Sequence, residues 1–78
     1  MAPSEQPQRG LGLAIRQLRE KSGMTQEAVA HEAGITASTL SVIERGESNP
    51  TWATVRRIAT ALNVSIVDVA TLAHGFKD

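Results

Sequence analysis

The stretch that decides the fold runs from Thr25 to Gly46 and reads "TQEAVAHEAGITASTLSVIERG". It holds two short runs whose apolar residues have helical spacing, and these runs break at Gly34 and resume after only a few residues. Neither run is long enough to be a stable helix alone, because isolated helices shorter than about 12–15 residues are marginal in water. We therefore expect neighbouring helices to hold this pair at a fixed angle.

Length and composition limit what surrounds the pair. The chain has 78 residues, of which 41% are hydrophobic, so one small globular domain is expected. A chain of this size buries only about 60% of its unfolded surface, which favours extra stabilisation by a second copy. The sequence contains no Cys, which excludes disulfides and thiolate metal sites.

Charge and hydropathy narrow the class of protein further. No stretch approaches the roughly 20 apolar residues of a membrane span, and the N-terminus lacks the apolar segment of a secretory signal. We therefore expect a cytoplasmic protein with no membrane partner. Lys and Arg total 8, and Asp and Glu total 8, which gives a formal net charge of zero. Any binding to nucleic acid must then depend on local positive charge.

The first ten residues, "MAPSEQPQRG", carry two prolines among polar residues. We expect residues 1–9 to form a flexible N-terminal arm and residues 10–78 to form a single domain. From Leu11 the apolar residues recur at helical spacing among charged residues, until Gly23 interrupts the pattern. The sequence therefore predicts an amphipathic first helix that begins at Leu11.

Two more helices follow the central pair, so the predicted fold class is all-α, with five helices and no strand. "GESNPT" has the composition of a turn, and Thr51 is a suitable N-cap for a fourth helix. Ser65 and Asp68 have the spacing of a capping box, and they open a fifth helix that should reach about Ala73. The residues expected to face the core in the second, third and fourth helices are Val29, Ala30, Ala33, Leu40, Ile43, Trp52, Val55, Ile58, Ala59 and Leu62.

Two short helices joined at a steep angle by a glycine turn allow the second helix to enter a DNA major groove while the first crosses the backbone. The central stretch therefore predicts a helix-turn-helix. "MTQEAVAHEAG", "ITASTLSVIERGESNP" and "VRRIATALNVS" resemble the phage-repressor-type helix-turn-helix module, the Cro/repressor or Xre-like family. The resemblance covers roughly residues 11–69 and implies a five-helix, phage-repressor-like DNA-binding domain.

The outer face of the third helix holds the expected DNA readers. Leu40 and Ile43 have the spacing of core residues, which leaves four residues of this helix facing outward. Thr36 opens the helix beside them. The resemblance implies that base contacts come from this region. The serines can make only single bonds to bases, whereas Gln, Arg, Lys or Asn at such positions can make bidentate ones. We therefore expect modest direct readout, with the Ala and Val able to contact thymine methyl groups, although Val42 has a simpler alternative as a tolerated exposed residue. The expected readers are Thr36, Ala37, Ser38, Ser41 and Val42.

Four further residues are candidates for contacts with the DNA backbone. Gln26 lies in the first turn of the second helix, where free N–H groups and the helix dipole favour a phosphate, and the resemblance implies that it clamps the backbone. Arg45, with Ser48 and Asn49 in the loop behind it, is expected to contact the far phosphates. The alternative for Arg45 is a solvated cation near a helix C-terminus.

Glu44 requires a different interpretation, because a carboxylate on a DNA-facing segment repels phosphate. The resemblance implies that it pairs with an arginine of the first helix, which is Arg19 in this sequence. We interpret Arg19 and Glu44 as a partly buried structural pair that connects the first helix to the third. Neither residue is then a DNA contact.

The fifth helix carries more apolar residues than one small core can cover. Ile66 and Val69 have inward spacing, whereas Val67, Leu72 and Phe76 put apolar groups elsewhere, and the resemblance implies a charged residue where Val67 stands. We expect these three to form a homodimer interface, which suits a protein that reads two half-sites of a palindromic operator. The alternative is a monomer with a mostly buried last helix.

Other chemistries find little support in the sequence. His31 and His74 are far apart and no Cys accompanies them, so no metal site and no cofactor are expected. There is no nucleophile elbow, so no enzyme is expected. Trp52 and Phe76 are too few to form a stacking platform for single strands, and Trp52 is expected in the core or an interface.

Three functional hypotheses follow. The first is a sequence-specific regulator of transcription that binds double-stranded DNA, as a homodimeric repressor. The second keeps the DNA-binding fold but makes the protein a restriction-modification controller or an antitoxin. The third is a helical protein-interaction adaptor without DNA binding, suggested by the zero net charge and the weak set of readers.

Overall fold

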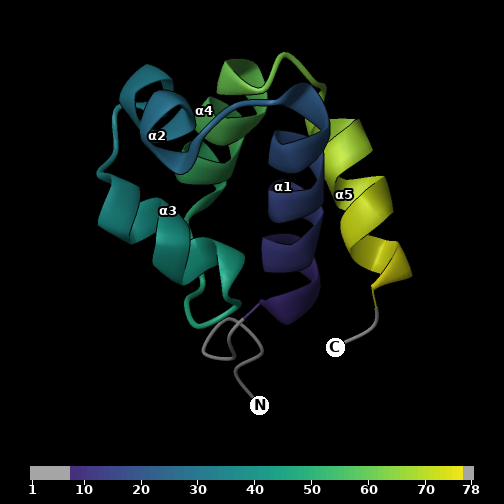
Figure 1. Cartoon of the computed structure of the whole chain (residues 1–78). Helices are drawn as coiled ribbons and strands as arrows, with labels where there is room; N and C mark the ends of the chain where they lie inside the picture. Colours follow the sequence, from purple (N-terminus) through teal and green to yellow (C-terminus); the bar gives the residue numbers. More distant parts are fainter. Residues whose placement is uncertain (1–7, 77–78) are drawn as a thin grey trace.

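The computed structural model describes residues 8–76, in which five α-helices follow one another without a strand. The helices are α1 (Arg9–Ser22), α2 (Gln26–Ala33), α3 (Ala37–Glu44), α4 (Trp52–Ala61) and α5 (Ile66–Gly75). Figure 1 shows α5 beside α1 and antiparallel to it, with α2 and α3 on the other side of α1. The expected all-α fold with five helices is confirmed for this part of the chain.

Hydroxyl side chains cap the N-termini of four of the five helices. The hydroxyls of Thr25, Thr36, Thr51 and Ser65 each accept a hydrogen bond from the backbone N–H three residues further on. At the last of these positions Asp68 bonds back to the backbone N–H of Ser65, which confirms the predicted capping box. The caps at Thr25 and Thr36 fix where the short helices α2 and α3 begin.

The first helix begins earlier than predicted. It starts at Arg9, so Arg9 belongs to α1 and not to the flexible arm, while the rest of the expected arm lies mostly outside the described residues. The backbone N–H of Gln8 donates to the carbonyl oxygen of Ser48 at 3.1 Å, which attaches the helix start to the loop after α3. A Cβ on Gly12 would collide with the carbonyl oxygen of Ile43, so this glycine allows α1 to lie directly against the end of α3.

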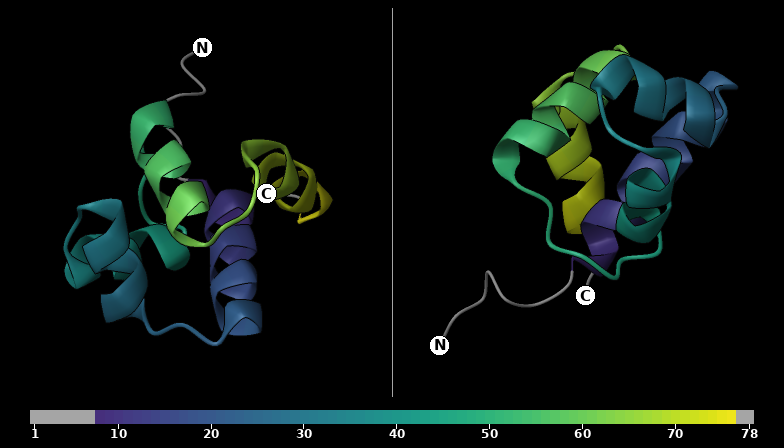
Figure 2. Two further views of the ribbon diagram at one scale, coloured as in Figure 1. Left: turned by 90° about the horizontal axis from the view of Figure 1, so that it is seen from above. Right: turned by 90° about the vertical axis from the view of Figure 1, so that its left-hand side faces the viewer.

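The core forms where all five helices meet, and Figure 2 shows the helices surrounding it from two further directions. The residues expected to face inward in α2, α3 and α4 are buried, with one exception. Trp52 is 64% exposed, so it does not lie in the core, and its alternative place in an interface stays a prediction. It is the first residue of α4, directly after the cap Thr51, and its side chain therefore lies beyond the end of the core that Val55 and Ile58 reach from later turns.

Among the described residues, no single helix is long and apolar enough to cross a membrane. Helices α4 and α5 together have the length and apolar composition of a membrane span, but the two helices are bent by 105° relative to each other. Several apolar residues of this pair, such as Ile58, Ala59 and Val69, are in the core.

Candidate nucleic-acid interface

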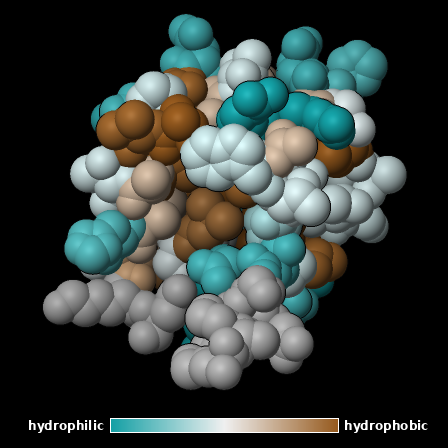
Figure 3. Space-filling model, turned by 180° about the vertical axis from the view of Figure 1, so that it is seen from behind, coloured by the Kyte–Doolittle hydropathy of each residue, from teal (hydrophilic) through white to brown (hydrophobic). Residues whose placement is uncertain are grey.

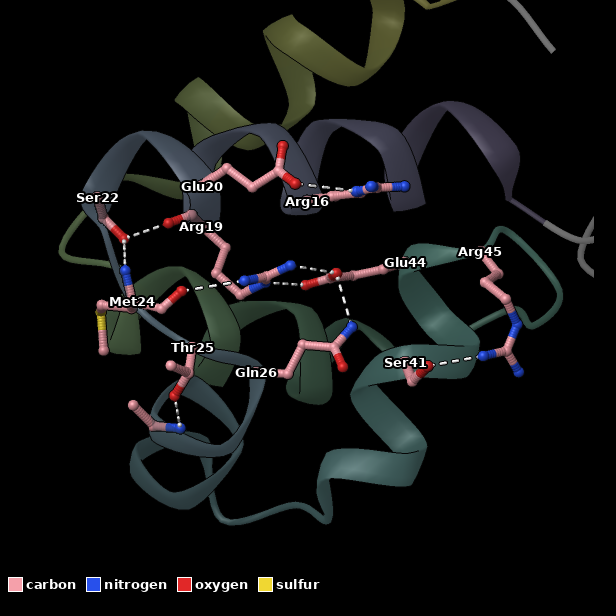
Figure 4. Close-up of polar contacts among 11 residues, drawn as sticks. Arg16, Arg19, Glu20, Ser22, Met24, Thr25, Gln26, Ser41, Glu44 and Arg45 are labelled. Atoms are coloured by element: carbon pink, nitrogen blue, oxygen red, sulfur yellow. Dashed lines mark hydrogen bonds and ion pairs between the residues drawn. The ribbon is translucent and has the colours of Figure 1, made fainter.

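One buried carboxylate connects the first three helices at the centre of the site. Glu44 of α3 accepts two hydrogen bonds from Arg19 of α1, from Nε at 2.7 Å and from Nη2 at 3.1 Å. Its Oε1 atom also accepts a hydrogen bond from the Nε2 group of Gln26, the first residue of α2, at 3.0 Å. Figure 4 shows the three side chains converging from their separate helices. The expected pairing of Arg19 with Glu44 is present.

This ion pair is shielded from water, with side-chain exposures of 14% for Arg19 and 3% for Glu44. The hydrogen bond with Glu44 raises the pKa of the Arg19 guanidinium above its usual value, against a smaller opposite effect of burial. Arg19 therefore remains a cation at any pH at which the protein is studied. Both oxygens of the Glu44 carboxylate accept hydrogen bonds, so it repels an anion that approaches the adjacent surface less than a free carboxylate would.

Beside this pair lies a polar hollow of about 240 Å³ between α1, α2 and α3. Three of the predicted DNA contacts line it, together with the structural pair and with one arginine that the sequence analysis did not select. The lining residues are Arg16, Arg19, Gln26, Ser41, Glu44 and Arg45. The hollow thus gathers three guanidinium groups, one amide and one hydroxyl around a single carboxylate. Guanidinium, amide and hydroxyl donors are suited to bind a phosphate oxygen. The exposed ion pairs of Arg16 with Glu20 and of Arg45 with Glu47 are weak enough to be exchanged for one.

Arg45 has partners within its own segment. Its Nη1 group donates to the Oγ atom of Ser41 at 2.6 Å, and its Nε group donates to the Oε1 atom of Glu47 at 3.1 Å. The first of these bonds spans one turn of α3 and appears in Figure 4. Ser41 is half-buried and shares the hollow with Gln26, so it lies with the candidates for backbone contact and not only with the expected base readers.

The other expected readers differ in how much surface they offer. Ser38 is exposed, and Val42 is half-buried. Thr36 is exposed, but its hydroxyl is engaged with the N–H and the Oγ1 of Thr39. Ala37 does not face fully outward as predicted, since it packs partly against the core. Its spacing of three residues from Leu40 puts it on the buried side of α3.

In the loop after α3, the two predicted phosphate contacts have opposite environments. Asn49 is exposed and free to approach a ligand. The Oγ atom of Ser48 is buried and has no hydrogen-bond partner among the described residues. A contact between this hydroxyl and DNA would require the loop to move, so Ser48 is placed unfavourably.

The three residues expected at a dimer interface do not share one face of α5. Val67 is 66% exposed, whereas Leu72 and Phe76 are half-buried. A separation of five residues rotates a side chain by about 140° around a helix, so Leu72 points well away from Val67. Phe76 instead lines a hollow with Leu13 of α1. A different group joins Ala70 of α5, since Trp52, Leu11 and Val55 line an apolar hollow of about 230 Å³ with it.

Sequence reasoning missed Arg16 and Glu47 at this site. Arg16 lies one turn before Glu20 and forms an exposed ion pair with it at 3.2 Å, which gave it the pattern of an ordinary solvated helix face. Arg16 lies three residues before Arg19, and this helical spacing was the signal that both side chains face α3. No comparable signal marked Glu47, because its position depends on the turn at Gly46.

Comparison with known proteins identifies the class to which this geometry belongs. The family model described as "Helix-turn-helix domain" matches residues 11–72. The HTH-type transcriptional regulator y4dJ of Sinorhizobium fredii is 41% identical over 61 residues, which cover 78% of this chain and 79% of that protein. The chain belongs to the helix-turn-helix family and is a DNA-binding transcriptional regulator of the Cro/repressor or Xre-like type.

Solved structures show the same arrangement of helices. The clp gene regulator ClgR from Corynebacterium glutamicum has a TM-score of 0.87 and 28% identity, and the match covers 91% of this chain and 92% of that one. The restriction-modification controller protein C.AhdI from Aeromonas hydrophila has a TM-score of 0.76 and 30% identity, with coverage of 78% and 92%. The expected phage-repressor-like fold is therefore confirmed.

Proposed function

We propose that this chain represses transcription as a homodimer that binds a palindromic operator in double-stranded DNA. The observation that carries the proposal is the polar hollow, where Arg16, Gln26 and Arg45 surround a carboxylate already bonded by Arg19. In this proposal the hollow receives one DNA phosphate at the start of α2, which orients α3 in the major groove. The net charge of zero does not oppose this, because Arg16 and Arg45 are held by exposed ion pairs, which are weak and can be exchanged for a phosphate.

In the same proposal, contacts with bases come from two residues of α3, Ser38, which is exposed, and Val42, which is half-buried. Ser41 and Arg45 act together on the backbone, because the bond from Arg45 to Oγ leaves the Ser41 hydroxyl able to donate to an acceptor. Phosphate oxygens offer only acceptors. Asn49 is the candidate for a contact from the loop, and Ser48 is left out.

The dimer in this proposal uses the apolar surface around α4 and α5. Trp52 and Val67 are the two most exposed large apolar residues among those described, and Ala70 lies within one turn of Val67. Figure 3 shows apolar atoms exposed in a hollow on the face opposite to that of Figure 1. Exposed apolar surface of this kind is typical of a protein interface, and a two-fold dimer uses the same surface twice.

A titration with duplex DNA at several salt concentrations tests the proposal. Phosphate contacts make the logarithm of the binding constant fall linearly with the logarithm of salt, by about 0.9 for each phosphate neutralised. A helical adaptor for other proteins would show no DNA affinity at any salt concentration. That result would reject DNA binding by this chain.

A restriction-modification controller is the second candidate function. It is supported by the likeness to C.AhdI, of which the match covers 92%. Such a role would use the same DNA-binding surface of the protein and would differ only in the genes that it controls. The two functions are distinguished by measuring which promoters respond when the protein is produced in cells. A controller should act on the promoters of restriction-modification genes next to its own gene.

A further inference from the structure

Glu47 is a carboxylate on the face that the proposed function assigns to DNA. Its Oε1 atom accepts a hydrogen bond from the Nε group of Arg45 at 3.1 Å, and the two side chains are 53% and 59% exposed. The DNA-binding arginine is therefore occupied by a negative group of its own chain before any DNA arrives. An exposed ion pair of this kind is weak, typically below about 1 kcal/mol, so it can be exchanged.

The position of Glu47 is fixed by the turn that ends α3. Gly46 has a φ of +73°, the left-handed conformation that glycine adopts without strain, and the backbone N–H of Glu47 donates to the carbonyl oxygen of Val42 at 3.2 Å. The chain is thereby turned back so that Glu47 stays beside the recognition helix. Arg9 of α1 lies nearby, since it lines a hollow of about 450 Å³ together with Arg45 and Glu47.

We propose that Glu47 limits DNA affinity by acting as an internal substitute for a phosphate. A carboxylate and a phosphate accept the same N–H groups of a guanidinium, so Arg45 must exchange one for the other when it binds DNA. After the exchange, the Glu47 charge remains close to the DNA backbone and is repelled by it. This inference rests on the proposed DNA binding, and it assigns to Glu47 a cost that every duplex must overcome.

Glu47→Gln tests the inference, because the amide keeps the size of the side chain and removes its charge. Duplex affinity should rise about fivefold at low salt, as expected for loss of one like charge near the backbone in a largely aqueous setting. The salt dependence should become steeper by about 0.9, since one more cation is available to replace counterions. The gain should shrink as salt is added.

Two further variants separate competition for Arg45 from a general change in charge. Glu32→Gln removes the same charge from an exposed residue at the opposite end of α2 from Gln26, and it should change affinity less than twofold. In an Arg45→Ala background, Glu47→Gln should gain at least twofold less than it gains in the parent, because no arginine is left to release. Melting curves of all variants check that each is folded.

The outcomes distinguish the inference from the function on which it rests. A gain from Glu47→Gln that is no larger than that from Glu32→Gln, or that is unchanged in the Arg45→Ala background, overturns the inference while DNA binding stands. Failure of the parent and every variant to bind any duplex overturns the proposed function and this inference together.

Discussion

Arg19 and Glu44 are 25 residues apart in the sequence and meet through two hydrogen bonds, at 2.7 and 3.1 Å. The same carboxylate accepts the Gln26 amide at 3.0 Å, so α1, α2 and α3 share one buried acceptor. The relation matters for function because Gln26 begins α2 and Glu44 ends α3. The two ends of the helix-turn-helix are thus connected by a residue that we do not expect to contact DNA itself.

Arg19→Ala should unfold at a markedly lower denaturant concentration. The change leaves Glu44 buried without its cation, and breaking such a pair typically costs about 3 kcal/mol or more. Chemical denaturation followed by circular dichroism measures the loss. The matched control is Arg16→Ala, which breaks an exposed pair with Glu20 and should cost less than about 0.5 kcal/mol of stability. Equal stabilities of the two variants would show that the buried pair is not structural.

Gly12→Ala should destabilise the fold by roughly 1–3 kcal/mol, because the added methyl group collides with the carbonyl oxygen of Ile43 and must push α1 away from α3. Gly75→Ala is the control, since nothing lies within 4 Å of a Cβ at that position. Thermal melting of both variants provides the comparison. If Gly12→Ala melts with or above the parent, α1 and α3 are not in close contact at this point.

Gln26→Ala should weaken binding to all duplexes by a similar factor, since a phosphate contact carries little sequence information. Binding titrations on several unrelated duplexes measure this factor, with Gln17→Ala, an exposed residue of α1, as the control. Because Gln26 also donates to Glu44, a small loss of stability is expected alongside. A shift in base preference without loss of affinity would exclude the phosphate assignment.

Ser38→Ala and Val42→Asn should each change the preference at particular base pairs, by roughly 1 kcal/mol for single contacts. Ser41→Ala should instead lower affinity for all sequences, because it removes the oxygen that Arg45 uses to position its guanidinium. Binding-site profiles of the three variants show which pattern each follows. Profiles for Ser38 and Val42 variants that superimpose on the parent would mean that α3 is not the reader.

Val67→Glu should loosen the dimer, since a two-fold interface would bury the new charge twice without partners. Sedimentation across protein concentration measures the change, and Leu13→Glu is the control that adds the same charge to an exposed apolar residue of α1. As the dimer weakens, the affinity of the variant for one palindromic DNA site should fall as well. If Val67→Glu remains dimeric while Leu13→Glu dissociates, the interface lies on α1 and not on α5.

The helices and their ends were predictable because local signals determine them. Caps at Thr25, Thr36, Thr51 and Ser65 act within three residues, and the apolar spacing of each helix identifies its buried side. The start of α1 could not be predicted in this way, because the backbone there is held by a hydrogen bond between Gln8 and Ser48, which is distant in the sequence. Trp52 failed for a related reason: helical spacing gives direction around the axis, whereas burial also depends on how far along the helix the core extends.

The candidate site was predictable only in part. Gln26 and Arg45 could be selected from their places at helix ends, and the pair of Arg19 with Glu44 came from the family resemblance. Arg16 joined them only when the folding of α1 against α3 was known, since its helical pattern equally fits a solvated ion pair. Leu72 and Phe76 were assigned to an interface from apolar excess alone, which cannot distinguish contact with α1 from contact with a second chain.

The central claim is that two copies of α3 read DNA together, and selection of bound sites from a pool of random duplex DNA tests it most directly. The parent protein should enrich sequences with two inverted half-sites whose centres are about 34 Å apart, or a multiple of that distance, as a two-fold pair of recognition helices requires. Sites without inverted symmetry, or a pool that remains random after repeated rounds, would contradict the account.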